Sequence, residues 1–287
     1  MPESMLVSRE ELRFDLGGAR FDLERDRSLL TWIFSQSLFG EATGCYCGAA
    51  LYTAPDIESA TFLSRQALEE FAHFHNFLRI FRILGTRPRP PHPVMRFLTT
   101  HEKLWDHHVC LEMAVGEGLV LIAFDMLIEA FDDPDIKAIL QAIADQECGH
   151  VRFGEQQTLK LLRERPRLRR QLLGRALISL AAMRLLGRHV QRWTPPGHPV
   201  MSRAPEFLEH AVRVTEMRLR RLGLLDRPLS ELGRLERAGL MALGPAAAFF
   251  RGLVTSRKPR IPRNYLQDPV IDRVLGAGRP TPGEPPA

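Results

Sequence analysis

Apolar residues recur along this chain at the three- and four-residue spacing of helices, and the strict alternation typical of strands is absent. The breaks in the pattern are short clusters of proline and glycine. The pattern predicts an all-α fold. Its expected helices run over about Arg27–Tyr52, Asp56–Gly85, Val94–Ala130, Pro134–Arg163, Leu168–Val190, Pro205–Leu222 and Leu229–Phe250.

These helices divide into two sets within one expected domain, residues 1–254. The four longer helices should form a bundle over about 27–163, built from two similar hairpins, with accessory helices over about 168–250. We expect a kink in the third helix near Gly116 or Gly118, because glycine weakens a helix. Residues 255–287 hold seven of the 21 prolines and are expected to form a loosely ordered tail.

One part of the first predicted helix is almost free of charge. Between Ser28 and Pro55, Glu41 is the only acidic, basic or histidine residue, although charged residues make up 25% of the chain. Gln36 and three glycines make this stretch too polar for a membrane span, which needs about 18 consecutive apolar residues. We therefore expect a buried helix and no membrane span. The charged N-terminus lacks the apolar core of a signal peptide, which favours a cytoplasmic location.

Two Glu-x-x-His motifs lie on the second and fourth predicted helices, at Glu70–His73 and Glu147–His150. Residues three apart share one face of a helix, so each motif can direct an oxygen and a nitrogen at one metal ion. A single motif of this kind is a weak signal. Two copies, each preceded by a helix that carries a glutamate, are far less expected by chance.

Helix register identifies which glutamates lie beside the motifs. Glu41 precedes the first turn by about as many residues as Glu70 follows it, and Glu117 is related to Glu147 in the same way across the second turn. At 1.5 Å per residue, each pair reaches nearly the same height in an antiparallel hairpin. Glu112 misses this register by six residues, about 9 Å, and remains the alternative to Glu117 as the third-helix ligand.

The predicted metal site therefore combines four carboxylates with two imidazoles. Such a cluster in an apolar core requires compensating charge, because like charges repel and lose their hydration there. Two divalent cations would supply it, and oxygen and nitrogen ligands without thiolate favour iron or manganese. Cys45 and Cys47 are two residues apart and point in different directions on a helix, so we expect them to pack in the core. The expected ligands are Glu41, Glu70, His73, Glu117, Glu147 and His150.

This ligand set resembles the ferritin-like di-iron carboxylate superfamily, in which two helices each give a Glu and two each give a Glu-x-x-His. Asp145–Glu155 is similar to the second metal motif of aldehyde-deformylating oxygenases, a distant resemblance. Phe77 stands where radical-bearing ribonucleotide reductase subunits have Tyr, and Gln146 where many relatives have Asp beside the metal ligand. The resemblance implies a ferritin-like four-helix bundle with two Fe ions, or Mn or mixed Mn/Fe, and O2 as co-substrate. It implies a monooxygenase or oxidase acting on a small organic, apolar substrate.

The sequence also bears on partners. No nicotinamide or flavin fingerprint is present, so electrons would come from an external donor, a ferredoxin or reductase; the net charge of +5 suits an acidic one. One alternative is a di-iron tRNA-modifying hydroxylase, using the basic segments Arg163–Arg170 and Arg257–Arg263. Because no array of aromatic and basic residues that could stack on bases accompanies them, nucleic acid is disfavoured as a partner. A second alternative is a non-catalytic, ferritin-like metal-handling protein. No sequence pattern indicates an oligomeric state.

Overall fold

The computed structural model describes residues 5–93, 95, 104–193 and 197–254. Within these ranges the chain forms helices and no strand, which confirms the all-α prediction. Among the described helices, none combines the length and the apolar character that spanning a bilayer requires. The principal elements are α1 (Arg9–Leu12), α2 (Arg27–Gly44), η1 (Cys45–Thr53), α3 (Ile57–Leu84), α5 (Trp105–His107), η2 (His108–Glu117), α6 (Gly118–Ala130), α7 (Pro134–Glu164), α8 (Leu168–Trp193), α9 (Ala204–Arg221) and α10 (Arg234–Val254).

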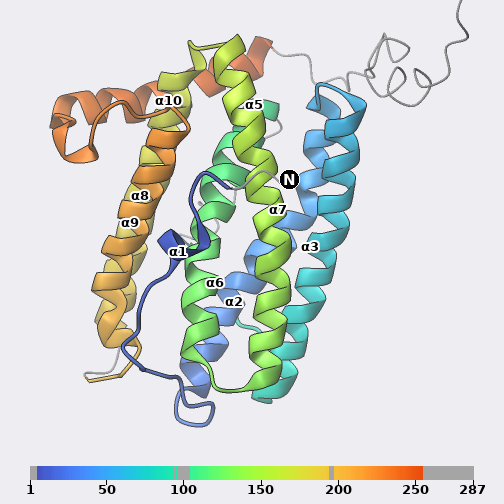
Figure 1. The fold of residues 1–287 in the computed structure, drawn as a ribbon, viewed down its shortest axis with the longest axis vertical. Coiled ribbons are helices and arrows are strands. Elements are labelled where there is room, and N and C mark those ends of the chain that lie inside the picture. Colours follow the sequence, from blue (N-terminus) through green and yellow to red (C-terminus); the bar gives the residue numbers. More distant parts are fainter. Residues whose placement is uncertain (1–4, 94, 96–103, 194–196, 255–287) are drawn as a thin grey trace, which may run out of the picture.

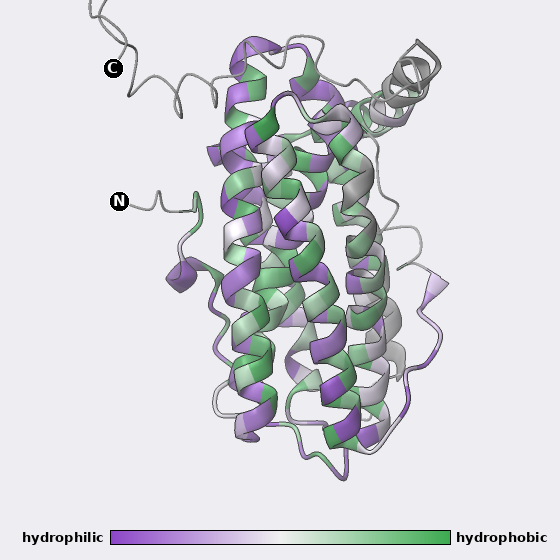
Figure 2. Cartoon of the chain, turned by 90° about the vertical axis from the view of Figure 1, so that its right-hand side faces the viewer, coloured by the Kyte–Doolittle hydropathy of each residue, from purple (hydrophilic) through white to green (hydrophobic). Residues whose placement is uncertain are grey.

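Four long segments, α2, α3, η2–α6 and α7, lie side by side along one axis, as two views of the molecule show (Figures 1 and 2). Their facing apolar side chains form a buried cluster that includes Phe34, Phe77 and Ile122. A second buried cluster joins η2 to α8, α9 and α10, through residues such as Met113 and Leu219. The accessory helices therefore complete the packing around η2.

The first predicted helix is not α-helical throughout. The α-helix α2 ends at Gly44, and the chain continues as the 3-10 helix η1 to Thr53. The prediction of one α-helix to Tyr52 is wrong in this respect; Gly44 and Gly48, both poor α-helix formers, lie where the change occurs. The next helix begins as expected, because Asp56 caps α3 by accepting a hydrogen bond from the Ser59 backbone N–H at 2.8 Å.

The third predicted helix contains a π-helix. Its expected start, at Val94 and residues 96–103, lies outside the described residues; α5 begins at Trp105. The π-helix η2 then runs to Glu117 and gives way to the α-helix α6 at Gly118, where a kink was expected. A π-helix hydrogen-bonds residue i to i+5, so η2 is wider than an α-helix.

The fourth predicted helix is observed as α7, with Asp133 as its cap and Pro134 in its first turn. The accessory helices α8 and α9 also occur close to their expected positions. The segment expected as one helix over Leu229–Phe250 instead divides into a 3-10 turn at Leu229–Glu231 and α10. The predicted tail, 255–287, lies outside the described residues.

Candidate metal centre

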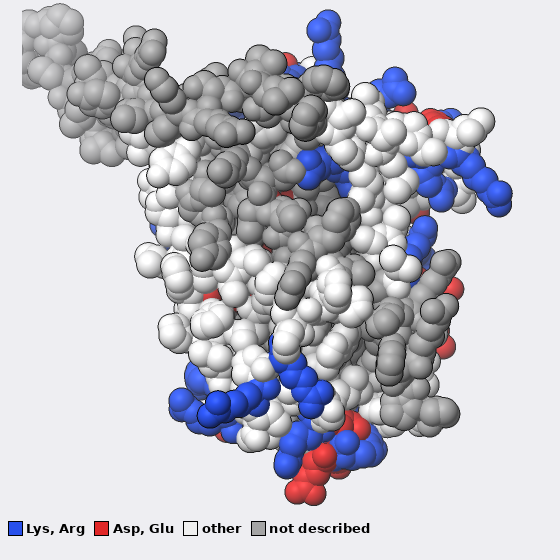
Figure 3. All heavy atoms as spheres, turned by 180° about the vertical axis from the view of Figure 1, so that it is seen from behind, with Lys and Arg blue, Asp and Glu red and all other residues white. Residues whose placement is uncertain are grey.

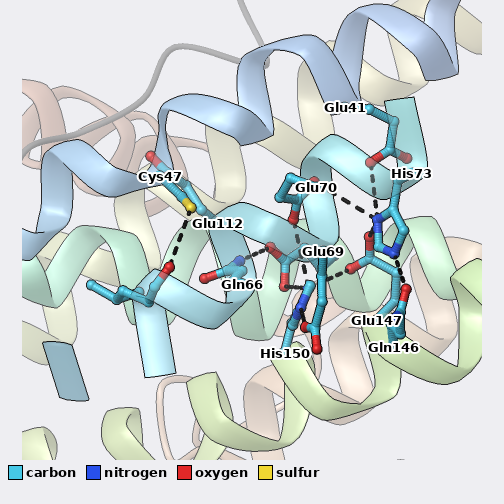
Figure 4. A network of polar contacts seen from close by, with 12 residues as sticks. Glu41, Cys47, Gln66, Glu69, Glu70, His73, Glu112, Gln146, Glu147 and His150 are labelled. Atoms are coloured by element: carbon cyan, nitrogen blue, oxygen red, sulfur yellow. Dashed lines mark hydrogen bonds and ion pairs between the residues drawn. The ribbon is translucent and has the colours of Figure 1, made fainter. Parts of the chain in front are cut away.

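The six predicted ligands come from four different segments and meet in the interior of the molecule. Glu41 is on α2, the first motif on α3, Glu117 at the end of η2, and the second motif on α7. Figure 4 shows the carboxylates of Glu41, Glu70 and Glu147 directed toward the two imidazoles. All six are buried except Glu117, whose side chain keeps 18% exposure.

The ligand atoms form two overlapping groups, in each of which all four atoms lie within 4.8 Å of one another. Each group offers three carboxylates and one imidazole, and such a group could hold a metal ion. Glu70 and Glu147 belong to both groups. We call the sets the His73 group (Glu41, Glu70, His73 and Glu147) and the His150 group (Glu70, Glu117, Glu147 and His150).

Both histidines present the same ring nitrogen to the carboxylates. Nδ1 of His73 lies 3.3 Å from Glu41 Oε2 and 3.3 Å from Glu147 Oε1. Nδ1 of His150 lies 3.2 Å from Glu147 Oε2 and 3.9 Å from Glu117 Oε2. Each Nδ1 is therefore placed to act as a metal ligand, provided that Nε2 carries the ring proton.

The hydrogen-bond partners of Nε2 determine that this nitrogen carries the ring proton, because both partners are oxygen acceptors. His73 Nε2 donates to Gln146 Oε1 at 2.8 Å, and His150 Nε2 donates to Glu69 Oε2 at 2.7 Å. Oriented partners of this kind are a regular feature of metal-binding histidines. Gln146, on the helix of the second motif, therefore orients the histidine of the first motif. Glu69 is not predicted from its spacing, although it precedes Glu70 as Gln146 precedes Glu147.

The electrostatics of the cluster reflect crowding of buried carboxylates. Burial raises the pKa of Glu41, and burial together with the Glu147 charge raises the pKa of Glu70 and that of Glu117, the latter to about 8. Burial acts the same way on Glu147, but hydrogen bonds from His150 and His73 outweigh it and lower its pKa to about 2.

The imidazoles compensate for this negative charge. Burial lowers the pKa of each histidine, but hydrogen bonds to Glu147 and to a second carboxylate outweigh it and raise both pKa values to about 11. In the absence of metal the cluster is therefore neutralised by protons on its histidines and carboxyl groups. These are the protons that a bound cation would replace.

The buried atoms also fit a metal ion in their hydrogen bonding. Glu117 Oε2 is buried and makes no hydrogen bond, and the buried His73 Nδ1 makes only long contacts, at 3.3 Å, to Glu41 and Glu147. Among the described residues, no Lys or Arg side chain forms an ion pair with Glu41, which would be the alternative to a metal there. Nitrogen and oxygen atoms that lack strong hydrogen bonds and surround a shared space are suitable ligands for a divalent cation.

Glu112 has a different role from Glu117. It belongs to neither ligand group, and its Oε2 lies 2.6 Å from Nδ1 of the buried His108. Glu112 and Glu117 are five residues apart, which on a π-helix places them one turn apart on the same side. The charge of Glu112 contributes to the raised pKa of Glu117, although less than burial and Glu147 do.

The cysteines add no thiolate to the centre. Cys47 is buried, with Sγ 3.9 Å from the Leu63 carbonyl oxygen, and burial raises the pKa of its thiol. It is therefore a neutral, core-packing residue, as expected. Cys148 lies within the second motif but faces away from the ligands, and its Sγ lies 3.3 Å from Arg9 Nη1.

Five apolar residues near the ligands are expected from the sequence either to pack in the core or to line an apolar pocket: Leu38, Phe39, Phe71, Phe74 and Phe77. Phe77 is fully buried and packs against Phe34 and Phe124 in the core. Phe71 is 52% exposed, so neither expectation holds for it; it is one position beyond Glu70 and hence turned away from it. A surface groove of about 600 Å³ lies instead among α8, α9 and α10, lined by residues that include Leu177 and Met241.

Of the two basic segments, only the first lies within the described residues. Arg169, in the first of them, is paired with Asp226 at 3.1 Å. On the face shown in Figure 3, Lys and Arg side chains gather in several separate groups.

Compared with protein-family models, with curated proteins and with solved structures, the chain matches none of them.

Proposed function

We propose that the chain is a ferritin-like di-iron oxidoreductase that uses O2 to oxidise a small, apolar organic substrate. The observation that supports it is the pair of overlapping ligand groups, which share Glu70 and Glu147 and each contain one histidine. Four helical segments that supply two single glutamates and two Glu-x-x-His motifs make up the ligand pattern of ferritin-like di-metal proteins.

Each of the two ions would be held by a different pair of ligands, together with the two carboxylates common to both groups. Glu41 and His73 would help to hold one ion and Glu117 and His150 the other, and Glu70 and Glu147, which belong to both groups, would be available to both. Carboxylate and imidazole ligands favour iron or manganese over softer metals. The total ligand charge of four carboxylates equals that of two divalent cations, so a loaded centre would be close to neutral within the apolar core.

When bound, two reduced iron ions would supply the electrons that activate O2. The chain itself orients the ligands and excludes water. Gln146 and Glu69 hold the imidazoles with Nδ1 inward. Phe62 packs edge-on against His150 and stacks on Phe153 at 3.8 Å between ring centres, which shields that side of the centre. The electrons for repeated turnover would come from a separate ferredoxin or reductase.

Metal analysis tests the proposal directly. Full-length chain loaded with Fe2+ without oxygen should bind about two ions, and its absorption spectrum should change on mixing with O2. Fewer than about two ions per chain would contradict the proposal. Iron binding with no O2-dependent spectral change would instead support the metal-handling alternative.

Variants identify the ligands. Glu41→Ala and His150→Ala should each lose at least one bound ion. Glu117→Ala and Glu112→Ala form a matched pair on the same side of η2, and only the first removes a member of a ligand group. We expect Glu117→Ala to lose metal and Glu112→Ala to retain both ions; the opposite result would assign Glu112 as the ligand.

A further inference from the structure

The two ligand groups contain the same types of ligand, but the residues that hydrogen-bond to their histidines differ. Each has three carboxylates and one imidazole, and two carboxylates are common to both. The outer partners of the histidines are related by position, since each directly precedes the motif glutamate of its own helix and reaches the histidine of the other helix. One partner is an amide, Gln146, and the other a carboxylate, Glu69 (Figure 4).

This difference changes the donor strength of the two imidazoles. A hydrogen bond to a carboxylate is charge-assisted and stronger than one to a neutral amide. The carboxylate therefore draws more strongly on the Nε2 proton of His150 and makes its Nδ1 the better electron donor. Substituting outer partners of metal-bound histidines changes metal affinity by roughly 10- to 100-fold in characterised sites.

A second contact favours the same group. Gln66 donates from Nε2 to Glu117 Oε1 at 2.9 Å, which fixes that carboxylate while Oε2 stays without a hydrogen bond. Glu117 is thus oriented before any ion binds. For Glu41, the hydrogen bonds to its carboxylate come from within the cluster itself, from His73 at 3.3 Å and from Glu70.

We propose that the two metal positions are inequivalent and that the first divalent ion binds in the His150 group. This inference rests on the proposed two-ion centre and deepens it, because it assigns the order of loading to Glu69 and Gln146. The ligands themselves are balanced between the groups, so the preference comes from these two outer residues, and the hydrogen bond from Gln66 to Glu117 adds a smaller contribution in the same direction.

Substoichiometric loading tests the order. One equivalent of Mn2+ added to metal-free full-length chain should give the electron paramagnetic resonance signal of isolated ions, and anomalous diffraction should locate manganese in the His150 group. A second equivalent should bind roughly 10- to 100-fold more weakly and convert the signal to that of a coupled pair. Equal affinities, or a first ion in the His73 group, would overturn the inference and leave the proposed function standing.

Exchanging the outer partners provides the matched control. Glu69→Gln should reduce the difference between the two affinities, Gln146→Glu should strengthen the His73 group, and the double variant should direct the first ion there. A residue with a merely structural role would not reverse the position of the first ion. An unchanged order in the double variant would overturn the inference, whereas fewer than two bound ions at saturation in the unaltered chain would overturn the proposed function and the inference with it.

Discussion

At the scale of single residues, the carboxylate of Glu70 occupies the space beside Gly44, where a side chain would otherwise lie. A Cβ built at Gly44 collides with Glu70 Oε2, whereas one built at Gly40, a turn earlier on α2, meets nothing within 4 Å. Gly44 is therefore needed because α2 and α3 approach each other closely at a ligand of both groups.

This contact predicts opposite outcomes for two identical substitutions. Gly44→Ala should displace Glu70 and weaken metal binding at least ~10-fold. Gly40→Ala should leave metal binding unchanged and stabilise the protein by up to about 1 kcal/mol, because alanine is the better helix former. Manganese titrations and thermal unfolding of the metal-free proteins would measure both effects. Equal metal affinities of the two variants would contradict the role assigned to Gly44.

Spacing along the sequence predicts the six ligand residues but not the surroundings of their neighbours. Residue type and spacing were enough to select the six side chains that the structure brings together, because a three-residue spacing on a helix defines one face. Glu69 and Phe71 were not correctly interpreted. Both are neighbours of Glu70, and on a helix each successive residue turns by about 100°, so their surroundings depend on which other helix lies there.

At the scale of elements, the predicted register depends on an α-helical rise of 1.5 Å per residue between each ligand glutamate and the turn of its hairpin, a segment called here an arm. The π-helix η2 ends at Glu117, and the chain from there to the second turn is the α-helix α6. The α-helical rise therefore applies to this arm. The arm from Glu41 contains the nine residues of η1, and a 3-10 helix rises about 0.5 Å more per residue. The excess, about 4.5 Å, equals three α-helical residues and agrees with Glu41 lying beside His73, three residues beyond Glu70.

The contact between α7 and α9 depends on a buried ion pair. Arg218 is fully buried, its Nε donates to Glu155 Oε1 at 3.0 Å, and the Leu6 backbone N–H donates to Glu155 Oε2 at 2.7 Å. The guanidinium also fills the space where Gly118, the residue after Glu117, would carry a side chain. One side chain thus connects the accessory helices, the N-terminal segment and the start of α6.

Removing this arginine should destabilise the protein far more than removing an exposed one. Arg218→Met leaves Glu155 charged and buried, which costs about 3–5 kcal/mol. The control, Arg227→Met, breaks the half-exposed pair with Glu236 and should change the free energy of unfolding by at most about 1 kcal/mol. Urea unfolding of the two variants would compare them, and similar losses would rule out a special role for the buried pair.

At the scale of the whole molecule, the cluster connects protonation to folding. Relative to its ordinary pKa of 4.5, Glu117 holds its proton to about pH 8 in the folded, metal-free protein, and both histidines hold theirs to about pH 11 instead of 6.5. The folded state therefore binds more protons than the unfolded state above pH 4.5. Stability must then fall as the pH rises, by about 1.4 kcal/mol per pH unit for each extra proton.

We therefore expect the melting temperature of the metal-free protein to decrease steadily from pH 6 to pH 8.5. Glu117→Gln removes one of the titrating groups, so the decrease between pH 6 and pH 8 should be shallower in that variant. Thermal unfolding in the presence of a chelator would measure both slopes. A melting temperature that rises over this range would show that the cluster does not retain these protons.

Bound metal should reverse this dependence, because a cation replaces the protons and requires deprotonated ligands. The stabilisation by a bound metal ion grows with the ratio of the metal concentration to its dissociation constant. That dissociation constant falls as the side chains that bind the metal lose their protons. At a fixed Mn2+ concentration, the increase in melting temperature over the chelated protein should therefore become larger from pH 6 to pH 8. His150→Ala, which lacks one imidazole ligand, should show a smaller increase at every pH. An increase that is independent of pH would mean that the metal does not displace the protons held by His73, Glu117 and His150, and hence that it binds outside the cluster.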